Sequence, residues 1–319
     1  MSIKHNTICK EFVDFFIEYG IIILYELIVN IGDSNLKMKK GLVMEGGAMR
    51  GLFTAGVTDV LMEHKIEFDG AVGVSAGAAF GCNVKSKQIG RALRYNVSYC
   101  NDKRYCSLYS LLTTGDLFGA EFCYHTLPDK LDIFDKETFY SNPMEFYVVC
   151  TDVLTGDPFY KRIDKQDADN FGEWVRASAS LPLISRIVEI EGHKLLDGGI
   201  ADSIPVKFME DMGYNRNVVI LTRPKDYVKS PSKSIKLMKY VLKNYPNLVK
   251  ALENRVDMYN KTVEYICEKE DKGELFVIRP EKSLPIERME TDPEKLKDVY
   301  EIGRLNMTNR IKELKEFLM

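Results

Sequence analysis

A stretch of small residues at 68–81 constrains the fold of this chain more than any other part of it. Its apolar start, at 70–74, is typical of a buried strand, and a helix is expected to begin at Ala76. The residues that join them, Gly73-Val74-Ser75-Ala76-Gly77, fit the G-x-S-x-G pattern of a nucleophile elbow. In this sharp turn the serine backbone is strained, so the positions two residues before and after it require glycine.

Two interpretations of Ser75 are open at this point. As a nucleophile, it would lie at the N-terminus of the following helix, where unpaired N–H groups and a partial positive charge stabilise an oxyanion. As a structural residue, it would be a solvated serine in a tight strand–helix turn. The flanking strand and helix patterns favour the catalytic interpretation, because they are the context that the motif requires.

A second glycine-rich loop lies one strand–helix unit upstream. An apolar strand at 41–44 ends in Glu45-Gly46-Gly47-Ala48-Met49-Arg50-Gly51, and a helix is predicted at 54–64. The loop lacks the Gly-Lys-Ser/Thr ending of a P-loop, and the dinucleotide-binding pattern fails at Ala48. The alternative is an oxyanion hole, for which the hydrolase elbow needs a second N–H donor. Arg50 is then either a substrate-facing cation or a helix-start residue whose charge is in water.

The order of strand, glycine loop, helix, strand, elbow and helix predicts an α/β fold with a mostly parallel sheet covered by helices. Further strands are expected at 145–153, 159–163, 187–191, 194–196, 217–221 and 274–278. Helices are expected at 88–100, 173–180 and 293–318. Asp152, at a strand end, is expected to cap the turn that follows it. Residues 102–143 have no clean period, and no element is assigned there.

Composition argues against several classes of function. The formal net charge of −3 provides no global attraction to nucleic acid or to an anionic membrane. The seven cysteines are dispersed without C-x-x-C spacing, which favours reduced thiols and a cytoplasmic location. The four histidines form no H-E-x-x-H or Cys/His cluster, so neither a metal site nor a cofactor is expected.

Three signals occur in order along the chain: Gly46-Gly47-Ala48-Met49-Arg50-Gly51, Gly73-Val74-Ser75-Ala76-Gly77, and Asp197-Gly198-Gly199. Alone, an aspartate before two glycines is usually a turn. Together the three resemble the patatin-like phospholipase family, and residues 176–182 are similar to that family's helix before the aspartate. Residues 43–57 resemble a bacterial branch of the family. The resemblance covers roughly residues 41–210 and implies a three-layer sandwich.

The resemblance also implies the roles of individual residues. Ser75 would be the nucleophile and Asp197 its base, with no histidine. The oxyanion and the substrate would be held by the glycine loop and the helix start, at Gly46, Gly47, Ala48, Met49, Arg50 and Ala76. The motif glycines are Gly51, Gly73, Gly77, Gly198 and Gly199. Ala48 replaces the usual glycine, and a backbone N–H donor tolerates alanine there if φ is negative.

The two ends of the chain differ from its centre. Residues 11–31 predict an amphipathic helix that docks on the main domain, with a membrane-surface or dimer role as the alternative. From residue 225 the pattern is Lys-rich, Tyr-rich and helical, and its basic patches are interpreted as solvated helix faces. The expected organisation is a helical extension at 1–38, a patatin-like domain at 39–212 and an α-rich accessory region at 213–319 on the same sheet.

The leading hypothesis is a serine acyl hydrolase that works through an acyl-enzyme. The residues alone indicate an ester or thioester substrate, and the resemblance implies that it is a lipid. A free aspartate is a weak base at neutral pH, and desolvation of its carboxylate would raise its basicity. The first alternative is a Ser-His-Asp esterase using His193 or His125, although no histidine follows Asp197. The second is a non-catalytic module that binds lipids or anions. The expected partners are a lipid or ester substrate and a peripherally contacted membrane surface, with no nucleic acid.

Overall fold

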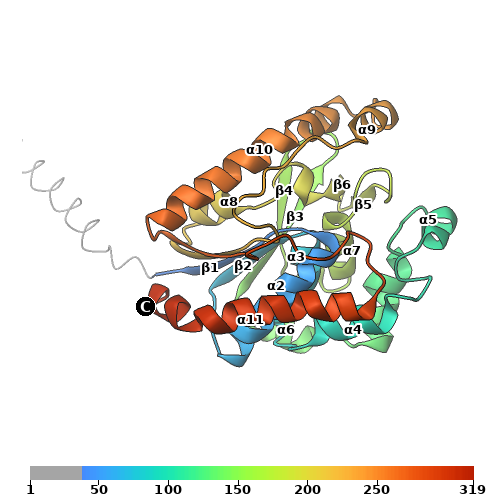
Figure 1. The fold of residues 1–319 in the computed structure, drawn as a ribbon. Coiled ribbons are helices and arrows are strands. Elements are labelled where there is room, and N and C mark those ends of the chain that lie inside the picture. Colours follow the sequence, from blue (N-terminus) through green and yellow to red (C-terminus); the bar gives the residue numbers. More distant parts are fainter. Residues whose placement is uncertain (1–37) are drawn as a thin grey trace, which may run out of the picture. The chain divides into compact units, whose positions relative to one another are not determined.

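A computed structural model describes residues 38–319, and its centre is an eight-stranded mixed sheet (Figure 1). The strand order is β5-β6-β3-β2-β1-β7-β8, and β4 pairs with β3. Strands β1, β2, β3, β7 and β8 are mutually parallel, whereas β4, β5 and β6 join through antiparallel pairs. The bounds are β1 Lys40–Met44, β2 Gly70–Val74, β3 Glu145–Asp152, β4 Pro158–Arg162, β5 Val188–Ile190, β6 His193–Asp197, β7 Arg216–Ile220 and β8 Leu275–Ile278.

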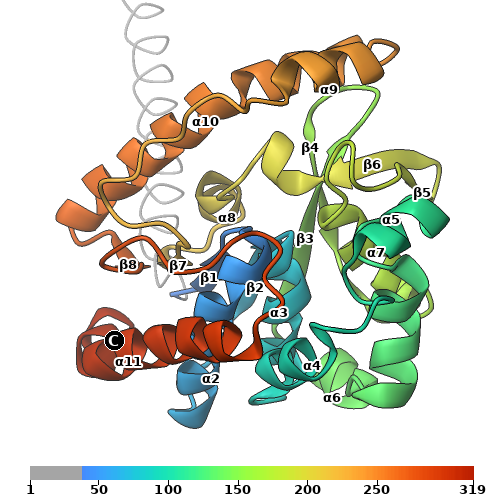
Figure 2. The same ribbon diagram turned by 45° about the vertical axis from the view of Figure 1, so that its right-hand side comes forward.

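Helices cover both faces of this sheet, so the predicted three-layer α/β sandwich is confirmed (Figures 1 and 2). Along β1, Leu42 and Met44 belong to the core on one face and Val43 to the core on the other, as strand geometry requires. The first face is covered by α2 (Gly51–Glu63), α3 (Ala76–Lys85), α4 (Arg91–Tyr99), α7 (Phe171–Ser178) and α11 (Pro293–Phe317). The second is covered by α8 (Val206–Asp211) and α10 (Pro246–Asp271).

The C-terminal region is mainly helical, and it is built into the sandwich. Strands β7 and β8 extend the sheet beyond β1, and α11 packs along α2. The two helices approach closely because each has a glycine at the crossing: a Cβ on Gly56 would lie 2.1 Å from the Tyr300 carbonyl oxygen. The Tyr300 hydroxyl also donates a hydrogen bond of 2.6 Å to the buried Asp59 carboxylate. Helix α9 (Ile235–Val241) lies at the end of α10.

The segment left unassigned from its sequence contains short helices of several kinds. These are α5 (Leu108–Thr114), the π-helix η2 (Phe122–Leu131) and α6 (Lys136–Ser141). A π-helix has a wider turn than an α-helix, and Pro128 lies inside this one, so an apolar period of 3.6 residues does not appear. Phe122 and Leu127 nevertheless belong to the main core. The segment therefore packs on the body of the domain.

The predicted N-terminal helix and the helices of the described residues bear on how the chain could meet a membrane. The amphipathic helix predicted at 11–31 falls outside the described residues. Among residues 38–319, no helix combines the length and the apolar character that crossing a membrane requires.

Candidate active site

The sheet register brings the three sequence signals to one edge. Val74, which precedes Ser75, pairs with Val149 on β3, and the next residue of β3, Cys150, pairs with Asp197. Ser75 and Asp197 therefore flank the same strand at the same level, although 122 residues separate them in the chain. Both residues line the same cavity, described below, and the Ser75 hydroxyl acts to lower the pKa of the Asp197 carboxyl against the larger effect of burial.

Ser75 occupies a strained turn that its neighbours hold in place. Its φ and ψ are 55° and −121°, a region that side-chain-bearing residues rarely adopt. The Ser75 N–H donates to Ser178 Oγ at 2.8 Å, and that hydroxyl donates to the Val149 carbonyl at 2.6 Å. A Cβ on Gly77 would lie 2.3 Å from the Met44 carbonyl oxygen. The glycine of the motif is thus required by close packing of α3 against the end of β1.

Asp197 is buried, with 2% of its surface exposed, at the end of β6. Its Oδ1 accepts a hydrogen bond of 2.8 Å from the Gly199 N–H. Burial raises the pKa of Asp197 above its usual range, against the opposing effects of Arg255, the Ser75 hydroxyl and the Gly199 N–H. The guanidinium of Arg255 lies against Gly199, where a Cβ would be only 3.3 Å from its Nη2. Glycine at this position therefore leaves room for Arg255 beside Asp197.

The glycine loop after β1 supplies several unpaired N–H groups. Within the described residues, the N–H groups of residues 46–49 and of Ala76 have no hydrogen-bond partner. Ala48 has a φ of 49°, so the negative φ under which alanine is readily tolerated is not met. Left-handed backbone costs a non-glycine residue about 1–2 kcal/mol. The backbone of the loop is therefore strained at Ala48 in the conformation that leaves these N–H groups unpaired.

Glu45 anchors this loop to the C-terminal region. It is 3% exposed, and its carboxylate accepts hydrogen bonds from the Thr222 N–H at 2.5 Å and the Tyr259 hydroxyl at 2.8 Å. A Cβ on Gly47 would lie 2.9 Å from Thr222 Oγ1. Helix α10, which carries Tyr259, is thus fixed directly to the loop that borders Ser75.

A mainly apolar cavity of about 160 Å³ opens on one side of Ser75. Met49 and Ala76 line it together with the serine, and the segment at 102–143 provides many of its other lining residues. Its large apolar and aromatic lining residues are Phe80, Tyr95, Tyr105, Phe118, Tyr124, Leu127, Phe134 and Phe171. This composition suits a hydrocarbon chain, and Ser75 is one of the few polar groups in the lining.

A second, polar cavity of about 60 Å³ also borders Ser75. Ala48, Ser75 and Leu181 line both cavities, so the two meet at the serine. The polar cavity is lined by Gly46, Gly47, Asp197, Gly199 and five basic side chains, those of Arg50, Arg223, Lys229, Arg255 and Arg288. Of the two sequence interpretations of Arg50, a charge in open water is wrong: the residue is 9% exposed. Burial, followed by the charge of Arg223, lowers the pKa of Arg50 to about 10.

Several residues of this site were missed by sequence reasoning. The interpretation of the C-terminal basic patches as solvated helix faces is wrong for Lys229 and Arg255, which are half-buried and line the polar cavity; Arg288 is exposed on a loop and lines it too. They lie far apart in the chain, on different elements, so no spacing indicated them. Ser178 was likewise not singled out, although it lies in the stretch at 176–182 that the resemblance highlighted.

The two histidines considered as general bases, His193 and His125, each lie close to a carboxylate other than Asp197. His193 Nδ1 lies 3.4 Å from Asp152 Oδ2, and His193 lines neither cavity. His125 lines the apolar cavity, with its Nε2 3.0 Å from Glu173 Oε1. Asp152 also accepts hydrogen bonds from the N–H groups of Leu154 and Thr155, which confirms its predicted role as a turn cap. In the described part of the chain, no cluster of side chains suitable for a metal ion occurs.

A sandwich with a strained serine elbow at a strand end has the architecture of the elbow-type α/β hydrolases as a class. The family model for patatin-like phospholipase matches residues 42–209, which is more than half of the chain. The chain therefore belongs to the patatin-like phospholipase family. A second model, for a domain of unknown function (DUF6363), matches residues 245–319.

Individual relatives cover different parts of the chain. The uncharacterized protein YjjU of Escherichia coli (strain K12) is 29% identical over 273 residues, covering 83% of this chain and 74% of YjjU. The lysophospholipase nte1 of Aspergillus oryzae is 28% identical over 181 residues, covering 54% of this chain but only 11% of that protein. The crystal structure of VipD from Legionella pneumophila has a TM-score of 0.44 at 12% identity, covering 86% of this chain and 67% of VipD.

Proposed function

We propose that this protein is a serine acyl hydrolase that cleaves carboxylic esters of lipids. The observation that carries the proposal is the placement of Ser75, on its strained elbow, and the buried Asp197 on either side of β3 at one level, where both line the same cavity. Family membership supports lipid esters as the substrate class, and one relative over half of this chain is a lysophospholipase. The proposed organisation is a hydrolase domain at 39–212 with an accessory region at 213–319.

Asp197 is the proposed base. Its raised pKa makes it a better proton acceptor than an exposed aspartate. Ser75 Oγ attacks the ester carbonyl carbon while its proton passes to Asp197. The tetrahedral intermediate then releases the alcohol, which takes that proton, and an acyl-serine forms. Water attacks the acyl-serine with Asp197 again accepting the proton, and the carboxylic acid leaves as the proton returns to Ser75 Oγ.

The oxyanion of each tetrahedral intermediate needs N–H donors. We assign this role to the unpaired N–H groups of Gly47, Ala48 and Met49, with that of Ala76 at the start of α3. Backbone donors that are already positioned need no reorganisation during the reaction, so the strain at Ala48 has a functional use. The acyl chain would occupy the apolar cavity.

Two alternatives are less well supported. A histidine triad would need an imidazole on Ser75, whereas His193 is held by Asp152 and His125 by Glu173. A non-catalytic binding module would have no use for a strained serine that shares a cavity with a buried carboxylate. The odd number of dispersed cysteines supports the proposed cytoplasmic location, from which lipid would be reached by peripheral contact with a membrane.

The test is a lipid hydrolysis screen combined with labelling by a fluorophosphonate probe. The wild-type protein should label and hydrolyse, and Ser75→Ala should lose both, with a rate at least about 10³-fold lower. Ser141→Ala is the matched control, because Ser141 is exposed on α6 and lines neither cavity. Labelling that persists in Ser75→Ala would move the nucleophile elsewhere.

A further inference from the structure

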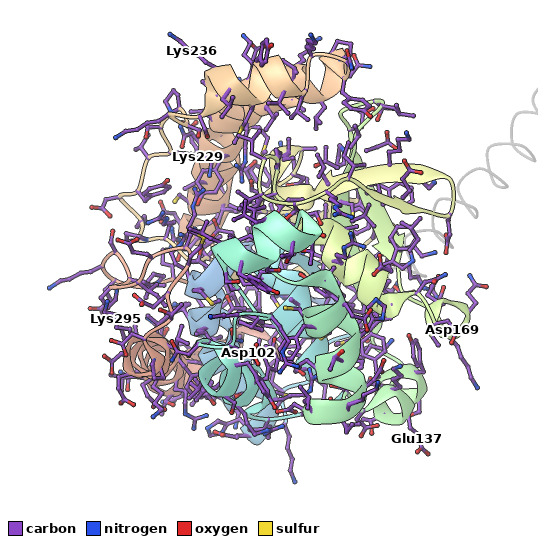
Figure 3. All side chains as sticks on the ribbon, turned by 90° about the vertical axis from the view of Figure 1, so that its right-hand side faces the viewer. Asp102, Glu137, Asp169, Lys229, Lys236 and Lys295 are labelled. Carbon is purple, nitrogen blue, oxygen red and sulfur yellow. The ribbon has the colours of Figure 1, made fainter. Side chains whose placement is uncertain are left out.

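The polar cavity beside Ser75 concentrates positive charge. Its walls carry five basic side chains against two carboxylates, those of Glu45 and Asp197. Arg50 comes from the glycine loop, and the other four come from beyond β7. Figure 3 labels Lys229, on the segment between β7 and α9. Arg255 lies on α10, and Arg288 lies on the loop between β8 and α11. The C-terminal region therefore supplies most of the charge of the cavity.

These five basic groups outnumber the carboxylates beside them, although Arg255 Nε donates a hydrogen bond of 2.5 Å to the Gly199 carbonyl. Arg50 is 9% exposed, yet its Nε has no hydrogen-bond partner. Within residues 38–319, none of the five forms an ion pair. Arg223 and Lys229 instead lie over the rings of Tyr227 and Tyr259, at 4.4 and 4.1 Å from the ring centroids. Like charges held together in a partly buried site favour the binding of an anion that pairs with them.

The excess of positive charge in this cavity also affects Lys229. Burial, followed by the charges of Arg255, Arg288 and Arg50, lowers the pKa of Lys229 to about 7, and only Glu45 opposes this. The ring of Tyr259 lies against the ammonium group from α10. An anion in the cavity would favour the charged form, so its binding above pH of about 7 should be accompanied by proton uptake.

We propose that Arg50, Arg223, Lys229, Arg255 and Arg288 form a binding site for a dianionic phosphate group, the terminal phosphate monoester of an acyl-lipid substrate. This assignment rests on the proposed ester hydrolysis at Ser75. The two cavities meet at the serine, so a phosphate in the polar cavity and an acyl chain in the apolar cavity place the connecting ester at Ser75 Oγ. The C-terminal region is then a specificity element.

A choline phosphodiester fits this cavity poorly. A quaternary ammonium group is normally bound by open aromatic faces. Here the faces of Tyr227 and Tyr259 are already covered by Arg223 and Lys229. The basic side chains would also repel a second cation, and a phosphodiester has one negative charge fewer than a monoester. The structure therefore favours monoesters over zwitterionic headgroups.

The first experiment measures anion binding without turnover. Sulfate, which stays a dianion, is titrated by calorimetry into full-length Ser75→Ala at about pH 8, in two buffers of different ionisation enthalpy. Binding should be accompanied by proton uptake, and Lys229→Gln should remove that uptake and weaken binding by about 10–100-fold. Lys236→Gln is the matched control, because Lys236 is exposed on α9 and lies outside the cavity (Figure 3).

The second experiment distinguishes a lipid headgroup from free phosphate. The ratio of kcat/KM for a monoacylglycerol phosphate to that for the matching monoacylglycerol is measured in wild type and in Arg223→Gln/Arg288→Gln. We expect the ratio to fall by about 10–100-fold in the double variant, and the matching choline ester to be a poor substrate of the wild type. Thermal unfolding of each variant checks that the fold is kept, and Arg288 is exposed on a loop.

The outcomes separate this proposal from the proposed activity. Ester hydrolysis without sulfate binding or headgroup preference would overturn the phosphate site alone. Sulfate binding in a protein that cleaves no ester would overturn the hydrolase and the headgroup assignment together. Binding and hydrolysis with an unchanged substrate ratio in the double variant would overturn the lipid headgroup in favour of a free inorganic anion.

Discussion

The two cavities that meet at Ser75 differ in composition and in origin. The apolar cavity is lined by residues between 48 and 181, which lie within the span of the family match. The polar cavity draws four of its five basic side chains from residues beyond 220. One cavity suits a hydrocarbon chain, and the other suits an anion. On our proposal, the family's shared fold provides the reaction centre, and the C-terminal region adds the binding site for the charged part of the substrate.

The comparison also explains how one serine can serve both cavities. Residues at the junction, Ala48, Ser75 and Leu181, line both, so a change at the reaction centre should affect every substrate equally. A change in one cavity should affect only the part of the substrate that occupies it. The following expected outcomes test this separation, beginning with the largest.

Asp197→Asn should lower kcat by about 10²–10⁴ for long, short, charged and neutral esters alike, because it removes the proposed base. Stopped-flow measurement of acylation with an ester of each kind checks this. His193→Ala is the control and should keep most of the activity, because His193 contacts Asp152 and lines neither cavity. Activity that survives Asp197→Asn but is lost in His193→Ala would contradict the dyad.

The same variant has an expected effect on stability. Because burial raises the pKa of Asp197, its contribution to stability is present below the unfolded-state pKa and is lost as pH rises through the folded-state pKa. Asp197→Asn should therefore be at least as stable as the wild type near neutral pH, by urea denaturation. A marked loss of stability in this variant would show that the Asp197 carboxylate stabilises the folded state through its contacts, which would contradict the destabilising effect of its burial.

Ala79→Leu should sharpen the comparison from the apolar side. Ala79 is half-buried and lines the apolar cavity, so a larger side chain removes space from the acyl chain. We expect kcat/KM for long-chain esters to fall by about 10-fold or more, since each lost methylene contact is worth about 1 kcal/mol or more. Acetyl esters are the internal control. An equal loss for acetyl and long-chain esters would indicate a distorted elbow instead.

Lys229→Gln tests the polar side through stability. A lowered Lys pKa means that this residue's contribution to stability is present above its ordinary pKa of 10.5 and is lost as pH falls through about 7. The variant should therefore gain a few degrees in Tm relative to wild type at about pH 6, and less at about pH 9. Lys236→Gln should show no such difference between the two pH values. An increase in Tm of the same size at both pH values would mean that the charge of Lys229 is not its cause.

Ala48→Gly has the smallest expected effect. Glycine removes the penalty of left-handed backbone at this position but adds entropy to the unfolded chain, so stability should rise by about 0.5–1 kcal/mol. Urea denaturation measures this change, and activity should be nearly constant because the donor is the backbone N–H. A large loss of kcat would mean that the alanine side chain itself shapes the junction of the two cavities.

Much of the fold and part of the site could be predicted from the sequence. The elbow is a local feature, because strand, turn and helix are adjacent, and small residues at 73 and 77 reflect close packing at that point. Strands such as β3 and β7 were predicted because a buried strand is a continuous apolar run. The segment at 102–143 could not be assigned, because a π-helix has no regular apolar period of the kind sought.

The sequence by itself determined the α/β order of elements, the serine elbow and the family. The first two depend on residues that are neighbours in the chain, where spacing has a direct geometric meaning. The family was indicated by the resemblance of three short motifs that occur in order at 46–51, 73–77 and 197–199. Only the tertiary structure decided that Ser75 and Asp197 lie at one level on either side of β3, since this requires the register of β2, β3 and β6. It also decided that Arg223, Lys229, Arg255 and Arg288 line one cavity, which the sequence could not indicate because they occur on separate elements with no common period. Packing of α10 and its flanking loops against the glycine loop converts apparently solvated charges into one wall of a cavity.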